Sequence, residues 1–124
     1  MAKGGGPNGL AHLRVKFSDG FYMGPGRADL LQGIAETGSI TQAGKRMDMS
    51  YKRAWSLVQA LNEGFGAPLV EASRGGAAQG GARLTADGQF VLHSYRAMQA
   101  AARAAIDNEL VTVQQRLGDI AQEK

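Results

Sequence analysis

The feature that most constrains the fold is a set of three helical segments joined by very short connections. The hydrophobic spacing predicts helices over residues 27–36, 40–47 and 51 to about 65. Gly38 ends the first helix, and Ser39 and Ser50 are placed to cap the next two. Only Asp48 and Met49 join the second helix to the third. Helices joined by so short a turn are typical of a helix-turn-helix, whose second helix can enter the major groove of DNA.

Short strands are predicted on both sides of this helical unit. Alternation from Leu13 onward predicts a half-buried strand, a turn at 18–20 and a second strand at 21–23. Two more strands are predicted at 69–72 and 82–84, joined by a tip that holds four glycines in nine residues. Such a tip cannot pack a core, so this hairpin is interpreted as the wing of a winged helix-turn-helix.

The last segment is predicted to be a long helix over 86–117, capped by Thr85. Its apolar stripe has the spacing of a helix-to-helix seam, and the candidate dimerisation residues on it are Val91, Tyr95, Met98, Ala102 and Ile106. The predicted fold class is therefore mainly α (α+β): a winged helix-turn-helix with short N-terminal strands, a glycine-rich wing and a long C-terminal dimerisation helix. The expected organisation is a flexible leader (1–9), one domain (10–117) and a tail (118–124).

Composition narrows the function classes. A chain of 124 residues fits one domain, and the lack of cysteine excludes disulfides and thiolate metal sites and suits a reducing cytoplasm. No apolar run approaches the roughly 20 residues that span a bilayer, so no membrane partner is expected. The net charge of +3 says little, but residues 45–53 carry four basic side chains against one acidic one. This segment could attract phosphates.

The sequence lacks the residue patterns of an enzyme or a metal site. His12 and His93 are far apart and have no carboxylate or second histidine at metal-ligand spacing. The acids form no pair, the serines lack a nucleophile context, and the glycine-rich tip lacks the Gly-Lys-Ser/Thr of a nucleotide loop. We expect neither catalysis nor a bound cofactor.

A resemblance to a known family makes this interpretation specific. Residues 38–55 (GSITQAGKRMDMSYKRAW), the tip at 74–81 (RGGAAQGG) and residues 84–88 (LTADG) resemble the N-terminal domain of ModE-type molybdenum-dependent transcriptional regulators. They are more distantly similar to the DNA-binding head of LysR-type regulators. The likeness runs from about 10 to about 105. It implies a sequence-specific DNA-binding transcriptional regulator that binds double-stranded DNA as a homodimer and controls genes for molybdate uptake or molybdoenzymes.

Two departures from the family pattern matter for function. The sequence ends at Lys124 without the C-terminal molybdate-binding modules of such regulators, so the predicted regulator lacks the family's sensor. Two possibilities stay open: the protein binds molybdate or tungstate as an effector, or its own abundance alone sets the level of regulation. The wing tip between Arg74 and Arg83 is uncharged where the family often carries a lysine, which predicts a weaker wing contact.

The candidate DNA-binding residues follow from the motif. Tyr51, Lys52 and Arg53 open the recognition helix and are expected to contact bases and phosphates, while the Ser50 backbone N–H can meet a phosphate. Trp55 has two interpretations, a partly buried support or a contact to sugar and base edges. Thr41 and Gln42 are further candidates, expected to contact the DNA backbone or to make no contact. For Arg74, Arg83, Lys45 and Arg46, phosphate binding and plain solvation are both open.

A rival hypothesis comes from a different class of function. Winged helices also serve as protein-interaction scaffolds that bind no DNA. The charge at Lys52 and Arg53 favours DNA, and the salt dependence of DNA retention distinguishes the two hypotheses.

Overall fold

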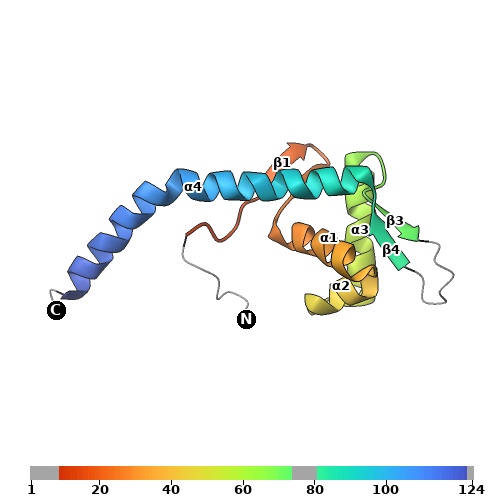
Figure 1. The fold of residues 1–124 in the computed structure, drawn as a ribbon, viewed down its shortest axis with the longest axis horizontal. Coiled ribbons are helices and arrows are strands. Elements are labelled where there is room, and N and C mark those ends of the chain that lie inside the picture. Colours follow the sequence, from red (N-terminus) through yellow and green to blue (C-terminus); the bar gives the residue numbers. More distant parts are fainter. Residues whose placement is uncertain (1–8, 74–80, 123–124) are drawn as a thin grey trace.

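A computed structural model describes residues 9–73 and 81–122 and shows a compact helical head attached to one end of a long helix (Figure 1). The elements in chain order are β1 (Val15–Ser18), β2 (Phe21–Met23), α1 (Pro25–Thr37), α2 (Ile40–Arg46), α3 (Tyr51–Phe65), β3 (Val70–Ser73), β4 (Gly81–Leu84) and α4 (Ala86–Gln122). The helical content and the two antiparallel strand pairs confirm the predicted winged helix-turn-helix.

The helix boundaries follow from local chemistry. Gly38 takes a left-handed conformation with a φ of 73°, which lets the chain leave α1 and turn into α2. The Ser39 hydroxyl accepts a hydrogen bond from the Gln42 backbone N–H at 3.1 Å, and the Ser50 hydroxyl accepts one from the Arg53 N–H at 3.1 Å. These caps confirm the predicted starts of α2 and α3, since each hydroxyl satisfies an amide that has no partner within its helix.

The turn between α2 and α3 is tight because the two helices approach closely. The Met49 N–H donates to the Gly44 carbonyl at 2.9 Å, and Asp48 adopts a positive φ of 56°. A Cβ added at Gly44 would lie 3.1 Å from the Ala54 Cβ. The glycine therefore permits the close crossing that fixes α3 against α2.

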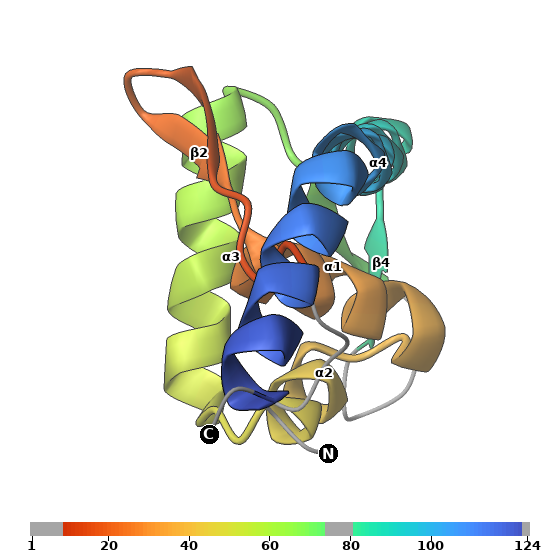
Figure 2. The same ribbon diagram turned by 90° about the vertical axis from the view of Figure 1, so that its left-hand side faces the viewer.

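The two hairpins lie at different ends of the head. The β1–β2 hairpin packs over the C-terminal end of α3, opposite the end at which α2 lies (Figure 2), and brings Phe21 within 5.7 Å of Phe65 between ring centroids. The β3–β4 pair is in antiparallel register from Val70 opposite Leu84 to Ser73 opposite Gly81. Both predicted strand pairs are confirmed, while the glycine-rich tip at 74–80 lies outside the described residues.

One hydrophobic core joins these elements. Its largest fully buried side chains are Met23, Leu30, Leu31, Ile34, Leu61, Leu69 and Tyr95. The Tyr95 hydroxyl donates to the Leu13 carbonyl at 2.6 Å, so the segment before β1 is tied to α4. Burial raises the pKa of the Tyr95 hydroxyl.

This packing changes the interpretation of the predicted dimer stripe. Val91 and Tyr95 are 6% and 0% exposed, so both are used in the chain's own core and are not free to face a partner. Met98 and Ala102 are half-buried, and Ile106 is 36% exposed. The helix continues to Gln122, so the predicted tail is helical from 118 to 122. In the described part of the chain, no helix is long and apolar enough to cross a membrane.

Candidate nucleic-acid interface

The outward face of α3 carries a polar stripe. Lys52, Ser56 and Gln59 are exposed and lie four and three residues apart, so they share one face of the helix. The opposite face holds the buried residues Ala54, Val58 and Leu61. Sequence reasoning chose Lys52 but missed Ser56 and Gln59. Their spacing from Lys52 was the signal that could have found them.

Tyr51 and Trp55 form an exposed aromatic pair beside this stripe. Their ring centroids lie 6.4 Å apart with an interplanar angle of 12°. Tyr51 is 57% exposed and Trp55 42%, so Trp55 is not a core residue. Trp55 lines a groove together with residues at the base of the wing, so both of its interpretations, a partly buried support and a contact to DNA, stay open.

A groove of about 250 Å³ lies between α3 and the base of the wing. Its lining brings together Thr41 from α2, the Tyr51–Trp55 pair and Gln59 from α3, and the residues at the foot of β3 and β4. Three of the predicted site residues thus meet in one place, while Gln42 is exposed at the start of α2. The groove joins the recognition helix and the wing into one surface.

The side chain of Asn62 fixes the wing to α3. Its Oδ1 accepts hydrogen bonds from the backbone N–H groups of Leu69 at 2.8 Å and Val70 at 3.2 Å, and its Nδ2 donates to the Val70 carbonyl at 3.2 Å. The Ala82 N–H donates to the Gly38 carbonyl at 2.9 Å, which anchors β4 to the turn before α2. Asn62 was not predicted, because its partners lie in another element.

The wing is also locked against the start of α4. The Thr85 hydroxyl donates to the Pro68 carbonyl at 2.7 Å and accepts from the Gly88 N–H at 3.0 Å, which confirms Thr85 as the cap of α4. A Cβ at Gly88 would collide with the carbonyl oxygen of Leu69. Only glycine allows this approach, so the orientation of the wing root is set by backbone packing.

Two of the predicted basic residues form ion pairs with carboxylates. Arg83 pairs with Glu71 across the hairpin at 3.0 Å, and Arg46 pairs with Glu36 at 2.6 Å. The hydrogen bond from Arg46 lowers the pKa of the Glu36 carboxyl. Both arginines are exposed but partly neutralised, whereas Arg74 lies outside the described residues.

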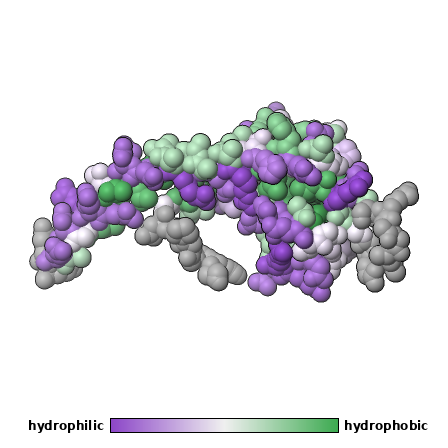
Figure 3. Space-filling model, in the orientation of Figure 1, coloured by the Kyte–Doolittle hydropathy of each residue, from purple (hydrophilic) through white to green (hydrophobic). Residues whose placement is uncertain are grey.

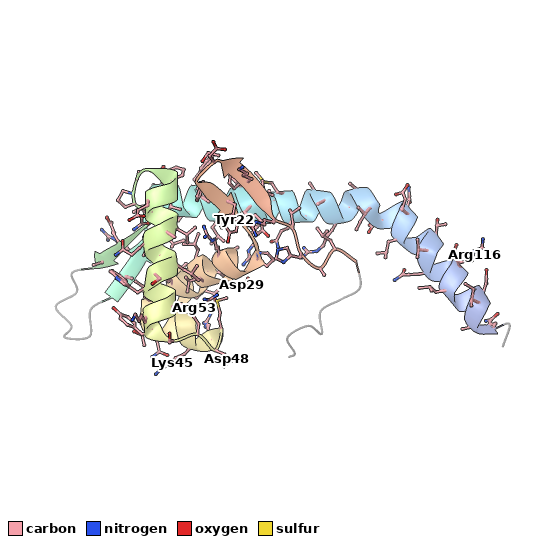
Figure 4. The ribbon with its side chains drawn as sticks, turned by 180° about the vertical axis from the view of Figure 1, so that it is seen from behind. Tyr22, Asp29, Lys45, Asp48, Arg53 and Arg116 are labelled. Atoms are coloured by element: carbon pink, nitrogen blue, oxygen red, sulfur yellow. The ribbon has the colours of Figure 1, made fainter. Side chains whose placement is uncertain are left out.

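Arg53 lies on a different side of α3 from the aromatic pair. Successive helix residues are rotated by about 100°, so Tyr51, Lys52 and Arg53 point in three directions. The structure places Arg53, labelled in Figure 4, at a separate pocket. Arg14 and Arg27 also line that pocket. The sequence predicted Tyr51, Lys52 and Arg53 as one contact set. In the structure Lys52 lies on the polar stripe and Tyr51 lines the groove, whereas Arg53 lies apart from both.

Within the residues that the structure describes, no three or more histidine, aspartate or glutamate side chains group closely enough to hold a metal ion. His12 and His93 are both exposed. The chemistry of the α3–wing surface is therefore that of hydrogen-bonding, aromatic and cationic side chains.

Comparison with known protein families agrees with this geometry. Residues 27–89, just over half of the chain, match the family described as "Bacterial regulatory helix-turn-helix protein, lysR family". The matched span runs from the first turn of α1 through the wing into the start of α4.

Similar individual proteins are also known. The chain is 42% identical over 99 residues to the molybdenum-pterin-binding protein MopB of Rhodobacter capsulatus, covering 79% of this chain and 37% of that protein. It is 36% identical over 95 residues to the DNA-binding transcriptional dual regulator ModE of Escherichia coli K12, covering 77% and 36%. The chain thus spans little more than a third of the length of these relatives.

A similar solved structure is described as a CbnR_DBD–DNA complex. It superposes with a TM-score of 0.56 and 26% sequence identity, and covers 70% of this chain and 94% of that one. That chain is bound to DNA in its crystal.

Proposed function

Because the chain belongs to the lysR family of bacterial regulatory helix-turn-helix proteins, with a DNA-binding domain of the ModE type, we propose that it is a sequence-specific transcriptional regulator. The observation that carries the proposal is the surface of α3, where an exposed polar stripe and an aromatic pair lie beside the wing. A DNA-binding regulator of this kind acts in the cytoplasm, where a bacterial chromosome lies.

The stripe suits direct readout in the major groove. Gln59 can pair with an adenine edge through both amide atoms, and the Ser56 hydroxyl can donate to or accept from any base. Lys52 acts as a point charge for a phosphate, and the Tyr51–Trp55 pair packs on the sugar–phosphate backbone. The wing then follows the backbone, with Arg83 contributing less than a free arginine because Glu71 holds it.

The distal half of α4 supplies the proposed homodimer contact. Five apolar residues there alternate at spacings of four and three, the pattern of a coiled-coil seam: Ile106, Leu110, Val113, Leu117 and Ile120. Four of them are at least 36% exposed in the single chain. A second copy would cover this seam and present two α3 helices about one DNA turn apart on a roughly palindromic site.

The names of the relatives suggest which genes are regulated. We propose genes for molybdate uptake or molybdoenzymes as targets, because similar proteins are named for molybdenum–pterin binding and as ModE. Direct sensing by this chain is tested by isothermal titration with molybdate and tungstate. Absence of heat with both anions would rule out direct sensing and leave the DNA-binding proposal untouched.

The test of DNA binding uses Lys52→Ala in fluorescence anisotropy with genomic DNA fragments at several salt concentrations. We expect affinity to fall roughly tenfold and the salt slope to drop by about one, since one phosphate contact is lost. Lys16→Ala is the matched control, because it removes the same charge from an exposed position in the β1–β2 hairpin. Unchanged binding by the Lys52 variant would reject α3 as the recognition helix, and retention that is independent of salt would favour the scaffold hypothesis.

A further inference from the structure

Two arginines enclose the ring of Tyr22. The guanidinium carbon of Arg14 lies 3.8 Å from the ring centroid and that of Arg27 lies 3.9 Å from it. One face of a phenol ring has no room for two guanidinium groups at that height, so the arginines occupy opposite faces. Stacking on an aromatic face leaves the N–H edge of a guanidinium free to donate.

These residues line a pocket of about 190 Å³ on the side of the head that Figure 4 labels with Tyr22 and Arg53. Arg53 from α3 and His12 also line it, together with the glycine-rich start of α1. Three guanidinium groups and an imidazole, from the segment before β1, from α1 and from α3, therefore converge on one cavity.

The pocket has no counter-charge among the described residues. No aspartate or glutamate of the described chain lines it, and none of its three arginines forms an ion pair there. Elsewhere in the head, Arg46, Arg83 and Arg96 each lie within 3.0 Å of a carboxylate oxygen. The arginines of the pocket thus differ from the ion-paired arginines of the head.

Hydrogen-bond donors at the pocket also lack acceptors. The Arg27 Nε is buried without a hydrogen-bond partner, and its Nη1 reaches the Tyr22 carbonyl only at 3.4 Å. Gly24, the residue before α1, offers no side-chain cap, so the amide groups of Gly26 and Arg27 receive no capping acceptor from it. A buried guanidinium N–H without an acceptor is rare in folded proteins, so the Arg27 side chain has unused hydrogen-bonding capacity.

We propose that this pocket binds the phosphate-type group of an oxyanion, with Arg14 and Arg27 donating from either side of Tyr22 and Arg53 closing the site from α3. The anion would accept from guanidinium N–H groups that line the pocket and neutralise the converging charges. Two sources share this chemistry: a phosphate of the DNA backbone beside α3, and a free inorganic oxyanion. The inference does not rest on the proposed DNA-binding function, because the pocket is complete in the single chain.

The test follows the Nε–Hε signals of the arginines by ¹H–¹⁵N NMR while sodium sulfate replaces sodium chloride at constant ionic strength. We expect saturable shifts for Arg14 and Arg27, and none for the exposed Arg116 on α4. Arg14→Gln should weaken sulfate binding roughly tenfold, because one charge-assisted donor is lost. Arg116→Gln removes the same charge from the exposed distal half of α4 and is the control that should bind as the wild type does.

A second titration with duplex DNA distinguishes the sources. If the site takes a backbone phosphate, DNA displaces sulfate and Arg14→Gln lowers the salt slope of DNA binding by about one. If it takes a free oxyanion, sulfate stays bound beside DNA and the variant binds DNA normally. Absence of saturable Arg14 and Arg27 shifts with both sulfate and DNA would overturn the proposal. A folded Arg14→Gln variant whose Arg27 signal still shifts with the affinity of the wild type would overturn it too. A protein that binds sulfate but no DNA would reject the proposed function and leave the pocket standing.

Discussion

The head and the distal half of α4 bury their apolar residues in opposite ways. In the head, leucine, isoleucine and methionine side chains from the helices and the strands close around one core, and Tyr95 is fully buried. From residue 100 to 122, every described side chain of α4 is exposed except Ala102 and Leu110, which are half-buried. Figure 3 shows strongly hydrophobic side chains on the surface of this distal half, among hydrophilic ones.

The difference separates a head that one chain completes from a helix face that we propose a second copy covers. Helices gain most of their stability from packing an apolar face, and the head supplies that packing internally. The distal half has the seam spacing of a coiled coil without a second helix on it. We infer that folding of the head and assembly through α4 are separate events, and the following predictions test that separation.

The largest expected effect is on the head. Gly88→Ala should lower the free energy of unfolding by about 3 kcal/mol, because the new Cβ would collide with the Leu69 carbonyl. Urea denaturation followed by circular dichroism measures the loss. Gly118→Ala is the matched control, since nothing lies within 4 Å of a Cβ there, and it should be neutral or stabilising. Equal effects of the two changes would contradict the division between head and distal helix.

The next effect is on assembly. Leu117 is 61% exposed in the single chain, so Leu117→Ala should cost the dimer about 2 kcal/mol per chain while leaving the head folded. Sedimentation equilibrium would then show a dissociation constant raised more than roughly tenfold. Val111→Ala removes a similar apolar side chain that is 48% exposed but outside the seam, and should leave the dimer intact. Loss of assembly in both variants would mean that the seam is misplaced.

A smaller effect concerns the link between core and wing. Asn62→Ala removes three hydrogen bonds and leaves the amides of Leu69 and Val70 without acceptors, so we expect a cost of about 1–3 kcal/mol. Hydrogen exchange at these two amides should accelerate more than exchange in the middle of α1. Uniform acceleration across the head would show that Asn62 supports the whole core and has no special role in the wing.

The smallest effect depends on pH. Burial raises the pKa of Tyr95 above its ordinary value of 10.0, so the folded state favours the neutral hydroxyl. Its contribution to stability is present below pH 10 and declines as the pH rises through the raised pKa of the folded state. Tyr95→Phe should cost about 1 kcal/mol at pH 7 and remove this alkaline loss. An alkaline decline of equal size in the variant would assign it to other groups.

Features set by local chemistry could be predicted from the sequence. Gly38, Ser39 and Ser50 mark helix ends because each acts on amides within three or four residues, and the glycine-rich tip marks the wing by composition alone. The residue-level match to a known family then gave the class of function.

Features set by long-range packing could not be predicted. The stripe on α4 was continuous in the sequence, but Val91 and Tyr95 belong to the core because α1 and the segment before β1 pack on them. The Asn62 contacts and the Arg14–Tyr22–Arg27 stack join residues whose proximity appears only in the folded chain. Periodicity shows that a face is apolar, and it does not show which neighbour covers it.

The most direct test of the central claim is sequencing of genomic DNA fragments retained by the purified full chain. The account predicts enrichment of one inverted repeat with half-sites about one DNA turn apart. Enrichment should be lost in Gln59→Ala, weakened in Lys52→Ala and kept in Lys16→Ala. Retention of random fragments, or an enriched motif that survives Gln59→Ala, would contradict sequence reading by this face.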